Sequence, residues 1–90
     1  MNVVIKHIAL IERIDRLTRL QATGSPEALA SRLEISKATL TRIIFIMREL
    51  DAPIAYDFTV QSYVYHESVV FRFGFFIKDA SLLNEKKLKN

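Results

Sequence analysis

The sequence predicts a small α+β domain with three helices, a β-hairpin and one further strand after it. Apolar residues recur at helical spacing over residues 3–50, in three stretches separated by turn-forming residues. Asp51-Ala52-Pro53 then ends the helical pattern, because the residue before a proline avoids helical backbone angles. Beyond it, aromatic and β-branched residues alternate as in strands. The 90 residues suit one domain, which we expect over residues 1–78, followed by a polar, Lys-rich tail over 79–90.

The first helix is predicted from Val3 to Leu20, a stretch that contains neither Gly nor Pro. Leu10 and Val3 lie outside its main apolar stripe, so this helix has to be covered on more than one side. The main stripe has the spacing of a helix face and consists of Ile8, Ile11, Ile14 and Leu17.

Two shorter helices follow, each preceded by a residue suited to capping. Gly24 ends the first helix, and Ser25 is a good N-cap for a helix over residues 26–33 that begins with proline. Ser36 is the next N-cap, and a third helix is expected over residues 37–50. Its buried stripe is predicted to consist of Leu40, Ile44, Met47 and Leu50.

The β-rich part begins with two short runs, Ile54–Asp57 and Ser62–His66, which predict an antiparallel hairpin. The stretch Ser68–Ile77 alternates apolar side chains over ten residues and predicts an extra C-terminal strand, which the sequence leaves open to pairing either within the chain or across a dimer. One face of that strand would carry Val69, Phe71, Phe73, Phe75 and Ile77.

Composition excludes several classes of protein. The absence of cysteine rules out disulfides, a thiol nucleophile and a Cys-based zinc site, while His7 and His66 are too few for a His-based metal site. No carboxylate pair, Gly-rich phosphate loop or Ser–His–Asp set stands out, so we expect neither an enzyme nor a cofactor. The apolar start is followed at once by Glu12 and Arg13 without a cleavage site, and no run is long enough to span a bilayer. We therefore expect a cytoplasmic protein without a membrane partner.

The formal net charge of +3 is unevenly distributed along the chain. Residues 1–50 hold eight basic and five acidic side chains, so the helical part is the basic part. Within it, the spacing of Ala30, Ile35, Leu40 and Ile44 fits a helix-turn-helix, in which an apolar residue in the turn plugs two short helices. Such a pair presents the start of its second helix to the DNA major groove.

The stretch Glu27–Arg42, EALASRLEISKATLTR, resembles the helix-turn-helix of DeoR-type and biotin-repressor-type winged helices, which read E-x-L-A-x-x-L-x-V-S-x-x-T-I-x-R. Downstream, Pro53-Ile54-Ala55-Tyr56-Asp57 and Tyr63 are similar to the P-I-x-Y-D…Y wing of these domains. The resemblance covers about residues 8–66. It implies a three-helix winged helix-turn-helix that binds double-stranded DNA as a small transcription regulator.

The resemblance also implies which residues contact DNA. Ser36 and Thr39 would meet phosphates or base edges near the helix start, Lys37 a phosphate, and Arg42 a phosphate or a guanine. The flanks of the groove would be covered by Arg32 and Arg48. The full set is Ser36, Lys37, Thr39, Thr41, Arg42, Arg32 and Arg48. The alternative for Lys37 and Arg42 is that they are solvated helix charges.

Three features depart from the family pattern. Ile43, Phe45 and Ile46 stand where the family has charged residues. The wing, residues 54–67, contains no Lys or Arg. Third, regulators of this type usually carry an effector domain, whereas we expect no small-molecule effector domain in a chain of this length.

The surplus of apolar residues predicts an interface with a second copy, and hence a homodimer. The residues expected there are Ile43, Phe45, Ile46, Phe71, Phe73 and Phe75. The rival interpretation is a winged-helix protein-interaction module that does not bind DNA, favoured by a wing that carries acidic but no basic residues and by the apolar third helix. A third use of the aromatic residues would be a stacking platform for single-stranded nucleic acid, although core or interface is the commoner role.

Overall fold

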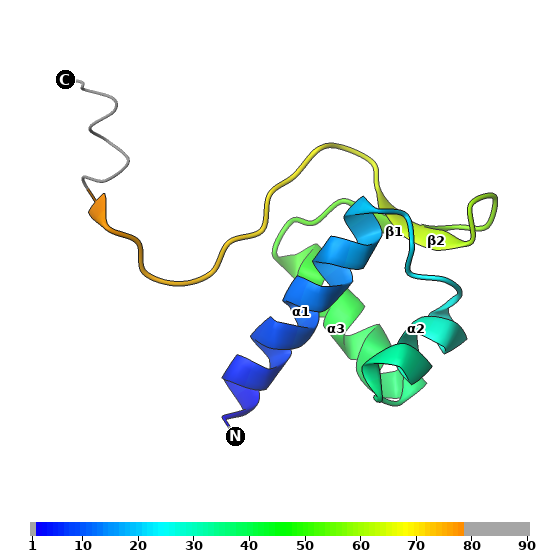
Figure 1. Ribbon diagram of the computed structural model, residues 1–90, viewed down its shortest axis with the longest axis horizontal. Coiled ribbons are helices and arrows are strands. Elements are labelled where there is room, and N and C mark those ends of the chain that lie inside the picture. The colour runs from blue at the N-terminus through cyan, green and yellow to red at the C-terminus, as the bar shows by residue number, and fades with distance from the viewer. Residues whose placement is uncertain (1, 79–90) are drawn as a thin grey trace.

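The computed structural model describes residues 2–78, which form three helices and a two-stranded antiparallel hairpin (Figure 1). The elements are α1 (Val3–Arg19), α2 (Pro26–Leu33), α3 (Lys37–Glu49), β1 (Ile54–Asp57) and β2 (Ser62–Tyr65). The predicted helices and hairpin are therefore confirmed to within one residue at each end. The polar tail expected over residues 79–90 lies outside the described residues.

Each helix begins at a side-chain cap. Asn2 Oδ1 accepts a hydrogen bond from Val4 N at 2.7 Å, and Ser25 Oγ accepts one from Ala28 N at 3.1 Å. Ser36 Oγ accepts one from Thr39 N at 3.0 Å. These bonds satisfy N–H groups that the first turn of a helix leaves without a partner, which confirms the caps predicted at Ser25 and Ser36.

The core is assembled from one side of each helix and one residue of each strand. Its buried members are Leu10, Ile11, Ile14, Leu29, Ala30, Leu33, Leu40, Ile43, Ile44, Met47, Ile54 and Tyr63. Because α3 contacts both α1 and α2, it buries a stripe wide enough to include Ile43. The prediction that Ile43 belongs to an intermolecular interface is wrong, since Ile43 has no exposed surface. Leu50, predicted to be buried, is 59% exposed because the helix ends before it.

The turn after α1 is hydrogen-bonded to β2 through the buried hydroxyl groups of Thr23 and Ser62. Thr23 N donates to Ser62 Oγ at 3.1 Å, and Tyr63 N donates to Thr23 Oγ1 at 2.9 Å. The Thr23 hydroxyl donates in turn to Gly24 O at 2.8 Å. The outer edge of β2 is thus occupied at Tyr63 by a side chain. Because buried polar groups without partners are costly, this network holds the hairpin against the helices.

A second link joins α1 to β2 through a buried carboxylate. The Tyr65 hydroxyl donates to Asp15 Oδ1 at 2.7 Å, and Arg19 Nε donates to Asp15 Oδ2 at 3.1 Å. The Arg19 guanidinium also lies over the Tyr65 ring, 5.6 Å from its centroid. Asp15 is only 8% exposed, so its charge needs both partners. Burial, and then the bond to Asp15, raise the pKa of Tyr65.

The extra strand predicted over Ser68–Ile77 is not formed in the described chain, whose sheet contains only β1 and β2. The edges of the hairpin explain why. Thr23 occupies the outer edge of β2, and Arg48 Nε donates to Ile54 O on β1 at 3.1 Å. The segment pairs with neither strand and instead runs past the helices and away from them (yellow to orange in Figure 1).

Replacing Tyr65 with phenylalanine is expected to reduce stability at pH 7 by about 1.5–3 kcal/mol, because Asp15 loses a charge-assisted hydrogen bond. The raised pKa of Tyr65 means that the native chain holds the phenolic proton more tightly than the unfolded chain. Its contribution is complete below about pH 10, the ordinary tyrosine value, and is lost as the pH rises above it. The variant should therefore lose less stability at alkaline pH than the wild type.

Urea unfolding followed by circular dichroism at pH 7, 9 and 10.5 measures both effects. Tyr56→Phe is the matched control, because the Tyr56 hydroxyl has only a 3.5 Å contact with Gln61 at the exposed turn. Tyr63, whose pKa is also raised by burial, leaves part of the alkaline loss in place. Equal alkaline sensitivity in Tyr65→Phe and wild type would contradict the role assigned to Tyr65.

Candidate nucleic-acid interface

The first two turns of α3 present a polar face to solvent. Lys37, Thr41 and Arg42 are exposed there, and Thr39 is half-buried. Leu40, Ile43, Ile44 and Met47 form the opposite, buried side. Since successive residues of a helix are separated by about 100°, burying this stripe turns the exposed residues directly outward. The core of the domain therefore fixes which side of α3 a partner can reach.

The start of α3 is suited to an anion. Ser36 Oγ caps Thr39 N and also donates to Thr39 Oγ1 at 3.0 Å, so these two hydroxyls bond each other. Lys37 N and Ala38 N have no acceptor within residues 2–78. Unpaired N–H groups and the positive end of the helix dipole favour a phosphate at this position.

Lys37 is paired with an acidic residue of α2. Its Nζ lies 2.9 Å from Glu27 Oε2, and both side chains are largely exposed. The hydrogen bond from Lys37 is the main reason that the pKa of Glu27 lies below its ordinary value. An ion pair so exposed to water contributes little stability, and a phosphate can compete for the Lys37 ammonium group.

Arg32 and Arg48, predicted to flank the groove, are directed elsewhere. Arg32 Nη1 donates to Ala22 O at 3.0 Å, on the side of α2 that faces the end of α1. Arg48 Nε donates to Ile54 O of the hairpin. The structure thus brings Ser36, Lys37, Thr41 and Arg42 together on one short helix, and does not gather Arg32 and Arg48 with them.

A second basic surface lies between α1 and α2 and, apart from Arg32, is formed by residues outside the predicted set of DNA contacts. Arg13 and Arg16 of α1 line a shallow hollow of about 200 Å³ together with Arg32 of α2. Arg19, one helical turn further on, instead turns to Asp15. Arg13 and Arg16 are three residues apart in sequence and so lie on one face of α1, whereas Arg32 joins them because α2 packs beside that helix.

The remaining predicted interface residues occupy different places. Phe45 is 59% exposed on the outward side of α3, whereas Ile46 is partly buried against the core. Phe71 also packs partly against the core, from the segment that follows β2. Phe73 and Phe75 are exposed further along that segment. The predicted set therefore does not form a single surface.

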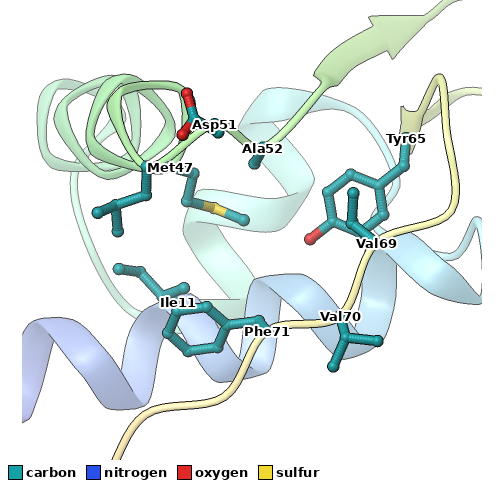
Figure 2. Close-up of a pocket in the computed structure, with 9 residues that line it drawn as sticks. Ile11, Met47, Asp51, Ala52, Tyr65, Val69, Val70 and Phe71 are labelled. Atoms are coloured by element: carbon teal, nitrogen blue, oxygen red, sulfur yellow. The ribbon is translucent and has the colours of Figure 1, made fainter.

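A small apolar cavity of about 130 Å³ lies between α1, the end of α3 and residues 69–71. Figure 2 shows the ring of Phe71 directed toward Ile11, with Met47 and Tyr65 at the other sides of the cavity and Val70 turned away from it. This cavity is on the buried side of α3. It is thus separate from the polar face that begins at Ser36.

Three other findings bear on the site. Within residues 2–78, no group of three His, Asp or Glu side chains is placed to hold a metal ion. None of the helices in this part of the chain is both long and apolar enough to cross a membrane. Comparisons of the chain with protein-family models, curated proteins and solved structures give no match.

Removing the Lys37 side chain is expected to move the pKa of Glu27 back up toward its ordinary value, because the hydrogen bond from Lys37 is the largest cause of the shift. A carboxyl-carbon NMR titration of wild type and Lys37→Ala measures this directly. The lowered pKa means that the ion pair is complete above the ordinary glutamate range and is lost as the pH falls through the lowered value. Lys6→Ala, which removes a distant lysine of α1, should leave the Glu27 titration unchanged. A Glu27 pKa identical in all three proteins would contradict the ion pair.

Proposed function

We propose that the chain is a winged-helix transcription regulator that binds duplex DNA, with α3 as the helix that enters the major groove. The observation that carries the proposal is the polar outward face of the first two turns of α3, where Lys37, Thr41 and Arg42 surround a capped helix start. The major groove is wide enough to admit one α-helix. Three helices and an antiparallel hairpin are compatible with a winged helix.

The length and packing of the α2–α3 pair support this use. The connector consists of residues 34–36, and Glu34 adopts a left-handed conformation with φ of 59° that ends α2. Ile35 packs partly against the core and holds the turn in place. Since α2 covers the inner side of α3, the outer side is left open to a partner. A helix-turn-helix uses its second helix in this way, with its N-terminal residues toward the bases.

The charges on α3 favour a polyanion over a basic or neutral protein surface. The helix carries Lys37 and Arg42 in its first half, and its first acidic residue is Glu49, in the last turn. Lys37 supplies a point charge for a phosphate, and Arg42 has the planar guanidinium that pairs with a phosphate or a guanine edge. Glu27 holds Lys37 in the free chain, so phosphate binding would replace one weak ion pair with another.

A protein-interaction module is the second candidate function. It is favoured by the exposed Phe45 ring near the middle of the outward side of α3 and by a hairpin that contains no Lys or Arg between residues 54 and 67. A wing that follows phosphates would normally carry a cation. If the partner is a protein, the Phe45 side chain is the expected anchor, since buried aromatic residues dominate such interfaces.

Fluorescence anisotropy with a random-sequence duplex at about 50 and 200 mM salt tests the DNA proposal, because phosphate contacts make affinity fall steeply with salt. We expect binding by the wild type at low salt that is greatly weakened at high salt. Lys37→Ala combined with Arg42→Ala should weaken binding strongly. It should also reduce the slope of log affinity against log salt by about 0.9 for each phosphate that the variant no longer neutralises.

Arg13→Ala combined with Arg16→Ala is the matched comparison. It also removes two positive charges, but from the separate hollow on α1. Weakening by the α3 pair alone supports recognition through α3. Weakening by the α1 pair alone would show that α3 is not the DNA-binding helix. No binding by the wild type at either salt concentration would favour the interaction module, with Phe45→Glu as the variant expected to disrupt its complex.

A further inference from the structure

The segment after β2 exposes more apolar surface than any other part of the described chain. Phe75 is fully exposed, and Phe73 and Phe76 are 60% and 66% exposed. Val70 and Ile77 are also largely exposed, while Arg72 is the one charged residue between Ser68 and Ile77. A contiguous apolar surface of this kind marks an interaction site.

The backbone of this segment makes no hydrogen bonds within the described residues. Residues 68–77 make no hydrogen bond with any other described residue, although their side chains alternate as in a strand. The edges of the hairpin are partly occupied, because Thr23 accepts from Tyr63 N on the outer side of β2 and Arg48 donates to Ile54 O on the outer side of β1. An extended, apolar segment with free N–H and C=O groups is a template for pairing with a strand from another chain.

We propose that residues 69–77 of two copies of the chain pair as antiparallel strands about a two-fold axis at Phe73, and that this pairing joins two copies into a dimer. The surface is separate from the first turns of α3, so the proposal does not depend on DNA binding. It provides a strand partner that residues 2–78 of one chain do not supply.

The sequence of the segment is complementary to itself in this register. Phe71 lies opposite the partner's Phe75, and Val69 lies opposite the partner's Ile77, so the apolar face continues through both strands. Arg72 lies opposite the partner's Gly74, which keeps the two guanidinium groups apart. A shift of one residue would place Phe73 beside Arg72 or Gly74 and break the apolar face.

An apolar groove beside the segment gives the paired strands a surface to cover. The groove has a volume of about 490 Å³ and is lined on the helices by Val4, Ile8, Ile46 and Leu50, with Phe73 on the segment. Phe71 packs partly on the core of its own chain, whereas Phe75 and Ile77 are exposed. Pairing brings Phe75 beside the partner's Phe71 and so over the groove of the partner.

The apolar area is sufficient for a specific dimer. An aromatic side chain buries about 150–250 Å², so the exposed parts of Phe73, Phe75 and Phe76 amount to roughly 450 Å² per chain. A standard interface needs about 800 Å² from each partner. Further exposed apolar area comes from Val4, Leu50 and Val70, which line the groove.

Cysteine cross-linking tests both the dimer and its register, because the chain has no cysteine of its own. A residue on the two-fold axis faces its own copy with a Cα–Cα distance of about 4.5–5.5 Å, which is within the range of a disulfide. The single variant Phe73→Cys should form a covalent dimer on mild oxidation. Phe58→Cys, which replaces an exposed ring on the hairpin turn, should remain monomeric on a denaturing gel.

Light scattering of the full chain at about 50 µM, near the range of moderate association constants, gives the oligomeric state. We expect a dimer for the wild type and for Phe58→Asp. Phe75→Asp should raise the dissociation constant by at least about tenfold without altering the circular dichroism spectrum, because the Phe75 side chain is fully exposed in its own chain. A monomeric wild type would overturn the proposal, and so would a dimer in which Phe73→Cys fails to cross-link.

Discussion

Burial of one side of α3 between α1 and α2 determines most other features of the molecule. Ile43 and Leu40 fill the centre of the core, so α3 cannot rotate without exposing them and disrupting the packing of both neighbours. The same packing decides which residues face outward. The position of Lys37, Thr41 and Arg42 in solvent is therefore a consequence of the core and not an independent feature of the surface.

The hairpin depends on the helices in the same sense. A two-stranded hairpin is only marginally stable alone. Here β2 is hydrogen-bonded to Asp15 of α1 and to Thr23 in the turn after α1. The Thr23 side chain bonds a backbone N–H of β2 where a third strand would otherwise have paired. The segment after β2 has no strand partner within residues 2–78.

The sequence was most informative where structure is set locally. Ser25 and Ser36 could be recognised as caps because a cap needs only a hydroxyl three residues before the N–H that it binds. No strand forms over Ser68–Ile77 within the described residues, because alternation leads to a strand only if another strand is available, and that depends in part on Thr23 and Arg48, which are distant in sequence. The burial of Ile43 was likewise missed, because the width of the buried stripe depends on two helices packing on α3 at once. The position of Arg32 beside Arg13 and Arg16 likewise depends on the packing of α2 against α1, which the sequence does not show.

Chemical-shift mapping of backbone amides during titration with a short DNA duplex decides whether a duplex meets the first two turns of α3. We expect the amide signals of residues 36–42 to shift with the added duplex, because the N–H groups at the start of α3 and the exposed side chains beside them would meet the phosphates. The amide signals of residues 69–77, which we propose to pair with a second copy of the chain, should shift little. Large shifts confined to the hollow formed by Arg13, Arg16 and Arg32, with residues 36–42 unchanged, would contradict recognition through α3.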